Sequence, residues 1–130
     1  MITELIIALG VTIATTSNPY VDCGGMSAIG CYYTQTKTII VADTPAGEDI
    51  LLHELGHALL YKDAKALALA GSQGYYYNEL TTTYILNGQD PREETTANLF
   101  RDYVRDRNKL SLFRPCFTLY LDYKINQLLK

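Results

Sequence analysis

His53-Glu54-Leu55-Gly56-His57 lies inside an apolar stretch and decides how the rest of the chain is interpreted. Leucine, isoleucine and alanine dominate residues 50–60 around it, a density that predicts a largely buried helix. Residues four positions apart lie on the same face of a helix, so we expect the two imidazoles to lie one turn apart on that face. Two histidines placed in this way can bind one metal ion.

The residues before this stretch carry the signals of a helix start. Thr44 is a candidate N-cap, Pro45 suits the first helical position, and Glu48 and Asp49 lie in the opening turns. We expect the helix to end near Lys62-Asp63 and a further helical segment to cover residues 64–70.

The residue between the histidines that matters most is Glu54. It directly follows the first ligand candidate, where a carboxylate can act as general base toward a water at the metal. Two surface histidines would be the alternative, but the surrounding leucines argue for burial, and buried imidazoles need partners. Zinc is the expected ion, because two imidazoles and a carboxylate suit a four-coordinate site that keeps one position for water.

A catalytic zinc site needs a third protein ligand, and the chain has only two histidines. The third ligand is therefore a carboxylate or a thiolate. Asp63 follows His57 by six residues, the spacing of the third ligand in some metzincin-like proteases. A thiolate of Cys23 or Cys31 could ligate as in peptide deformylase-like enzymes.

Glu93 and Glu94 are the remaining candidates, on a helix expected from Pro91 to about Arg107. Asp90 is its predicted N-cap, and Glu93 at the third position completes a capping box, which leaves Glu94 free to ligate. Helical periodicity favours Glu93 instead, because Glu93 is centred on the apolar stripe formed by Ala97, Phe100 and Val104. We prefer Glu94.

The remaining pattern predicts an α+β fold in a single domain, residues 1–130. A short helix over Ile2–Leu9 is expected to break at Gly10 into a strand over residues 11–15. Residues 31–42 favour a hairpin that ends in the strand Thr38–Ala42, with a turn at residues 35–37. A last helix is expected over residues 117–129, so that strands come early and helices late.

Composition excludes several classes of protein. The 130 residues are 48% hydrophobic and 19% charged, which is typical of a folded globular chain. A net charge of -3 argues against binding nucleic acid or an anionic membrane through basic residues. The apolar start carries Glu4 and no basic residue before Lys37, unlike a signal peptide, which favours a cytoplasmic over a secreted location.

Three cysteines leave at least one thiol outside any internal disulfide. Cys23 and Cys31 bracket a glycine-rich segment and could close a small disulfide loop. Alternatively, all three cysteines, Cys116 included, are small buried hydrophobic residues. The sequence does not decide between these interpretations.

The order of strand, His53-Glu54-Leu55-Gly56-His57 helix and Glu94-Thr95-Thr96-Ala97-Asn98 helix resembles a minimal gluzincin. It is similar to the catalytic core of ImmA/IrrE-type metallopeptidases and to the stand-alone minigluzincins, over residues 38–104. The resemblance implies a zincin-like domain with a small mixed sheet. It also implies that Glu94 binds zinc and that Asn98, one turn on, supports a histidine through a hydrogen bond.

The same resemblance implies zinc-dependent endopeptidase activity, with Glu54 as the general base for a metal-activated water. The substrate would be a peptide or protein bound in extended form along an edge strand, which we expect to be Thr38–Ala42. An oxyanion donor would come from a tyrosine or arginine, the candidates being Tyr75, Tyr76, Tyr77, Tyr84 and Arg101.

Two other functions are consistent with the sequence. One is a latent or non-catalytic zincin that acts as a peptide-binding module, held inactive by its own segment from Phe113 onward. Intact Glu54 argues against it, because a scaffold needs no base beside the metal. The other is a different hydrolase, such as a deformylase, which would require a cysteine ligand.

Overall fold

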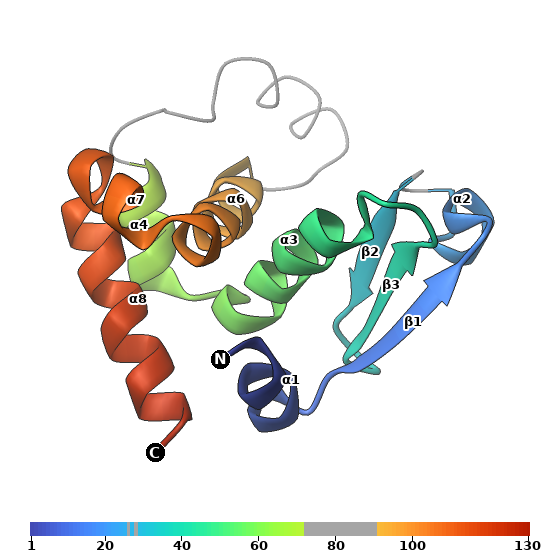
Figure 1. Ribbon diagram of the computed structural model, residues 1–130, viewed down its shortest axis with the longest axis horizontal. Helices are drawn as coiled ribbons and strands as arrows, with labels where there is room; N and C mark the ends of the chain where they lie inside the picture. The colour runs from blue at the N-terminus through green and yellow to red at the C-terminus, as the bar shows by residue number, and fades with distance from the viewer. Residues whose placement is uncertain (26, 28, 72–90) are drawn as a thin grey trace.

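A small mixed sheet lies at one end of the molecule and most of the helices lie at the other, with one long helix between them (Figure 1). The computed structural model describes residues 1–25, 27, 29–71 and 91–130. Within these ranges the architecture is α+β, as the sequence predicts. No helix in the described ranges combines the length and the apolar character that crossing a bilayer requires.

The chain begins with helix α1, Ile2–Leu9, and strand β1, Thr12–Thr16. Gly10 ends the helix with φ 68°, a left-handed conformation that glycine adopts without steric cost. The predicted helix, break and strand are therefore confirmed. A short helix that we did not predict, α2, Pro19–Asp22, follows, with the Asn18 side chain accepting a hydrogen bond from the amide of Val21.

Strands β2, Gly30–Tyr33, and β3, Thr38–Ala42, form the predicted hairpin. The sheet order is β1-β3-β2, with β1 parallel and β2 antiparallel to β3. The expectation that Thr38–Ala42 is an edge strand is wrong, because β3 pairs on both sides. Its residues Ile39 and Val41 are buried, as befits a central strand, and β2 forms the edge beside the helices.

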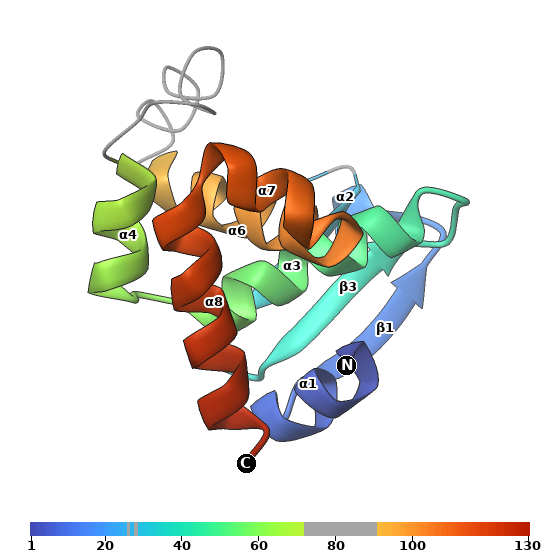
Figure 2. The same cartoon turned by 60° about the vertical axis from the view of Figure 1, so that its left-hand side comes forward.

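Helix α3, Gly47–Leu60, carries the two histidines across the middle of the molecule (Figure 2). It begins later than predicted, because the Gly47 amide bonds to the Thr44 carbonyl in a turn that absorbs Thr44 and Pro45. The helix ends at Leu60. Lys62, with φ 52°, turns the chain into helix α4, Ala64–Gly71, whose first turn is capped by the Asp63 carboxylate.

Helix α6, Pro91–Arg105, packs against α3. It ends before the predicted Arg107, because Asp106 caps a separate helix, α7, Arg107–Phe113, that we did not predict. Helix α8, Pro115–Leu128, completes the chain. The predicted capping box cannot be evaluated, because Asp90 lies outside the described residues.

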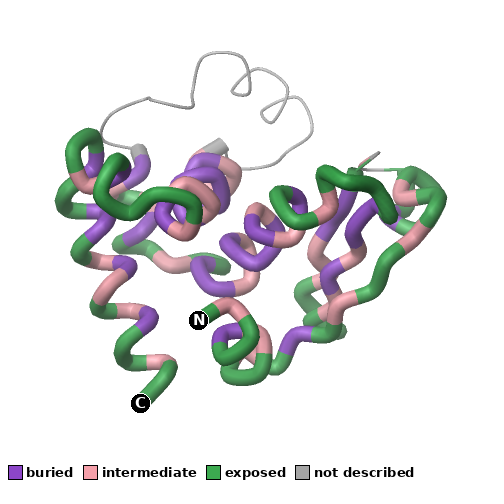
Figure 3. Tube along the Cα trace, in the orientation of Figure 1, coloured by how far each residue is buried: buried purple, intermediate pink, exposed green. Residues whose placement is uncertain are grey.

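The core lies between the sheet, α3, α6 and α8 (Figure 3). Its largest fully buried apolar side chains come from all these elements and from α1: Leu5, Ile39, Leu55, Leu60, Leu99, Phe100, Phe117 and Leu121. Because both helices bury large side chains in this core, close packing holds α3 and α6 against each other.

Candidate metal centre

Gly56 sets the distance between α3 and α6. A Cβ atom at this position would lie 2.9 Å from both the Cα and the carbonyl oxygen of Ala97, and 3.1 Å from the Cβ of Phe100. Only glycine leaves room for so close an approach of the two backbones. The residues of α6 one turn before Ala97 are thereby brought next to the histidines of α3.

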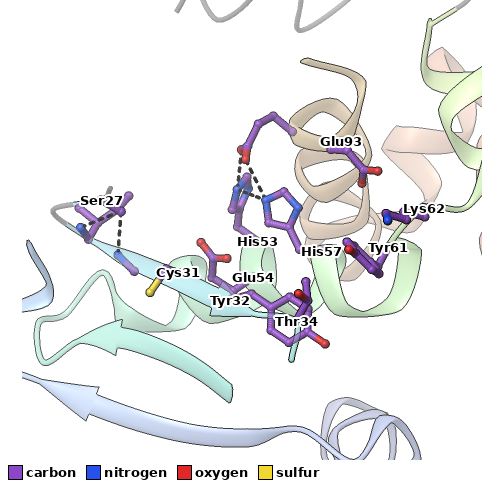
Figure 4. Close-up of a pocket in the computed structure, with 13 residues that line it drawn as sticks. Ser27, Cys31, Tyr32, Thr34, His53, Glu54, His57, Tyr61, Lys62 and Glu93 are labelled. Carbon is purple, nitrogen blue, oxygen red and sulfur yellow. Dashed lines mark hydrogen bonds and ion pairs between the residues drawn. The ribbon is translucent and has the colours of Figure 1, made fainter. Parts of the chain in front are cut away.

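Three side chains meet at this crossing. The Nε2 atoms of His53 and His57 lie 3.2 Å apart. Glu94 of α6 reaches both: its Oε2 lies 2.8 Å from His53 Nε2 and its Oε1 lies 2.9 Å from His57 Nε2. One donor atom from each residue falls within 4.8 Å of the others (Figure 4).

Asn98 orients the first histidine. Its side-chain oxygen Oδ1 lies 2.7 Å from Nδ1 of His53. Because an amide oxygen only accepts, the proton of this hydrogen bond is on Nδ1, and Nε2 is the ring nitrogen that faces Glu94 and His57. Asn98 itself is buried, so the imidazole is held by a partner with little freedom to move.

Glu54 lies beside the pair of histidines, on the side that faces β2 (Figure 4). Glu54 is only 7% exposed. Burial raises the pKa of its carboxyl, as does the charge of Glu94, whereas the nearby His57 and His53 lower it; the net shift is upward. A carboxylate with a raised pKa is a better proton acceptor than an exposed one.

The charges and hydrogen bonds within the cluster shift the pKa values of Glu94 and His57. Burial would raise the pKa of Glu94, but the hydrogen bonds and charges of His53 and His57 outweigh it and hold that pKa far below its usual range. Burial opposes the charged form of His57, yet the hydrogen bond and charge of Glu94 raise its pKa. Glu94 is therefore ionised, which a metal ligand must be.

A cavity of about 410 Å³ opens over these residues. One wall is the edge strand β2 with the residues just before and after it, including Ile29, Cys31, Tyr32 and Thr34. The other wall is α3, the two residues that follow it and the start of α6. Figure 4 shows Ser27 at one end and Thr34 with Tyr61 at the other. The three candidate metal ligands, the buried carboxylate of Glu54 and an edge of β2 that pairs with no strand in the described residues thus share one space.

Sequence reasoning missed three residues of the cavity lining: Tyr32, Tyr61 and Lys62. Tyr61 and Lys62 lie just beyond Leu60, the last residue of α3, so helical spacing does not predict that they reach the cavity. Tyr32 is on the strand that we did not recognise as the edge. Burial and the neighbouring Tyr61 raise the pKa of Tyr32.

The structure places the other ligand candidates elsewhere. Asp63 accepts hydrogen bonds from Tyr120 and pairs with Lys124 of α8, 2.7 Å away. Glu93 lines the cavity but is not in the donor cluster. Neither carboxylate shares the position of Glu94.

The cysteine hypotheses are also settled by position. Cys23 and Cys31 form a disulfide, which ties α2 to the edge strand. A cysteine thiolate ligand is therefore wrong for this structure, and so is the interpretation of all three cysteines as buried hydrophobic residues, since Cys116 is exposed.

Of the oxyanion candidates, Arg101 lies outside the cavity lining, with its Nε 3.5 Å from Asp102 Oδ1. Tyr75, Tyr76, Tyr77 and Tyr84 lie outside the described residues. The segment from Phe113 onward, which the latent alternative invokes, contributes no residue to the cavity lining. Helix α8 contacts α7, α4 and α1 instead (Figure 2).

Comparison with known proteins finds no match: no family model, no curated protein and no solved structure matches this chain.

Proposed function

We propose that this protein is a zinc-dependent endopeptidase with a gluzincin-like site. The observation that carries the proposal is the convergence of His53, His57 and Glu94 beside the buried carboxylate of Glu54, in a cavity walled by a strand edge. Each feature has a structural alternative when taken alone. Their combination in one cavity is what hydrolysis of a peptide bond at a metal requires.

The donor set fits zinc. Two imidazole nitrogens and one carboxylate oxygen form a common set of protein ligands for catalytic zinc. A tetrahedral ion with bonds of about 2.0–2.1 Å separates its ligand atoms by about 3.3 Å. The two histidine nitrogens, 3.2 Å apart, are already at that spacing, and the Glu94 oxygens lie slightly closer, as expected of direct hydrogen bonds.

When bound, zinc would act as a Lewis acid that lowers the pKa of water and polarises a carbonyl. The chain supplies the rest. Glu54 accepts the proton of the attacking water and can return it to the departing amine. Asn98 keeps His53 in the required tautomer and orientation.

The edge strand β2 provides the substrate site. Its partner β3 occupies one side, and its other edge faces the cavity, where an extended peptide can add as a further strand. Main-chain pairing of this kind tolerates many side chains and needs no free chain end. These properties favour cleavage within a chain.

Glu54→Gln provides the test. The amide keeps the volume of the side chain but cannot accept the proton, so we expect kcat to fall by about 10²–10⁴ on an unfolded protein substrate. Zinc content and the midpoint of thermal unfolding should stay close to those of the wild type. Equal activity in the two proteins would refute the base assignment; zinc binding without activity in either would favour a peptide-binding module.

A further inference from the structure

The described lining of the cavity contains one lysine, Lys62, and no arginine. Lys62 lies at the end marked by Thr34 and Tyr61 (Figure 4). Its ammonium nitrogen lies 5.3 Å from the centre of the Tyr61 ring. In the described part of the chain, Lys62 forms no ion pair with a carboxylate. Its charge is therefore available to a molecule that enters the cavity.

Lys62 has a left-handed backbone, as Lys37 between β2 and β3 also has. Its φ of 52° is in the left-handed region, where a side chain costs about 1 kcal/mol and glycine is preferred. This turn separates α3 from α4 and directs the chain past the cavity.

We propose that Lys62 determines substrate specificity by binding an aspartate or glutamate side chain of the peptide, on the Thr34 side of the bond to be cleaved. This inference rests on the proposed function and adds a substrate class to it. A peptide that pairs with β2 passes the histidines and Glu54 and then reaches Tyr32, Thr34 and Lys62. The Tyr61 ring limits the positions that the ammonium group can take, which favours one register of the peptide.

Glu93 of α6 lines the same cavity and provides a negative charge whose effect on an acidic peptide opposes that of Lys62. Its carboxylate repels an acidic peptide side chain, whereas Lys62 attracts it. Removing the charge of Glu93 and removing the charge of Lys62 should therefore change the affinity for acidic peptides in opposite directions. A nonspecific effect of mutation would not produce this pattern.

The test measures binding, so it does not depend on turnover. Fluorescent peptides with a single glutamate at successive positions, and matched peptides with glutamine, are titrated into zinc-loaded Glu54→Gln protein, and Kd is read from anisotropy. We expect one glutamate position to bind about three- to fivefold more tightly than glutamine, the range of an exposed ion pair. Added Lys62→Gln should abolish that preference, Lys62→Glu should invert it, and Glu93→Gln should enlarge it.

Lys65 is a matched control. Its ammonium nitrogen lies 5.3 Å from the centre of the Tyr120 ring, the same arrangement as at Lys62, but Lys65 is not in the cavity lining. Lys65→Gln should leave the preference unchanged. If glutamate and glutamine peptides bind equally at every position, the role of Lys62 is refuted and the proposed function stands; if no peptide binds, both fail.

Discussion

The two walls of the cavity are built in different ways. All three proposed metal ligands come from the pair of helices α3 and α6, whose contact is buried and as close as glycine permits. The opposite wall is the strand β2, which within the described part of the chain pairs on one side only and is tied to α2 by a disulfide. The helix pair fixes atoms, whereas the strand offers a surface.

This difference matches what each wall must do in the proposed reaction. Metal ligands must stay within tenths of an ångström of their positions, and a packed helix contact provides that rigidity. A strand that binds extended peptides must leave its N–H and C=O groups on one edge unpaired and open to the cavity. That edge is therefore not held in place by hydrogen bonds to a neighbouring strand. Changes to the strand should therefore leave zinc binding largely intact, and changes to the helix pair should leave peptide binding by the strand largely intact.

The largest expected effect is at Glu94. Glu94→Ala removes a ligand and leaves the two imidazoles without their carboxylate partner, so zinc affinity should fall more than hundredfold, beyond the 10- to 100-fold typical of an outer partner such as Asn98. Dialysis against a competing chelator followed by metal analysis measures this. Glu93→Ala is the matched control on the same helix; zinc loss there instead would reverse our assignment.

The opposite wall is perturbed by removing its disulfide. Replacing both Cys23 and Cys31 with serine releases a loop closed over a separation of eight residues, which should lower the free energy of unfolding by about 2.5 kcal/mol. We expect a higher KM, because the edge strand is held less firmly, and an unchanged zinc content. Chemical denaturation and metal analysis measure the two properties.

Cys116→Ser is the control for that variant, because Cys116 is exposed and forms no disulfide. It should match the wild type in stability, KM and zinc content. Zinc loss in the Cys23/Cys31 variant would show that the two walls are not independent.

Gly56→Ala perturbs the helix contact with a single methyl group. The clash is with the backbone of Ala97, which cannot move aside as a side chain could, so we expect a loss of about 1–3 kcal/mol in stability together with weaker zinc binding. Gly47→Ala makes the same change at the start of α3, where the nearest atom to the added carbon is the Ala42 carbonyl oxygen at 3.1 Å. That control should keep wild-type zinc affinity; a similar loss in both variants would contradict the role of Gly56.

Local signals in the sequence predicted much of this arrangement. The spacing of His53 and His57 predicted a shared helical face. The helix after Pro91 offered Glu93 and Glu94 as candidate third ligands, and Glu94 is the one that contacts both histidines in the structure. Caps at helix ends were less decisive. Thr44 and Pro45 carry the signals of a helix start, but a turn at Gly47 uses them differently.

What could not be predicted depends on pairing between distant segments. Whether Thr38–Ala42 is central or at an edge is decided by β1, which joins it in parallel after a crossover that local patterns do not encode. The disulfide likewise depends on α2 lying beside β2. Tyr61 and Lys62 enter the cavity because α3 ends where it does.

The smallest effect is expected at Asp63, which the sequence offered beside Glu94 as a candidate third metal ligand. Asp63 is bonded to Tyr120 and Lys124, and although burial raises the pKa of its carboxyl, these hydrogen bonds lower it below the usual 3.8. A lowered pKa means that the ionised form stabilises the fold above pH 3.8 and that this contribution is lost as pH falls through the lowered value.

Asp63→Asn removes the charge but retains a residue that can cap α4, so the change isolates the ion pair. We expect a modest loss of stability at neutral pH and a flatter decline of stability in acid, measured by denaturation between pH 2 and pH 7. Zinc content should stay at the wild-type value, in contrast to Glu94→Ala. That result would show that Asp63 links the start of α4 to α8 and does not bind the metal. Zinc loss in Asp63→Asn would instead show that Asp63 contributes to the metal site.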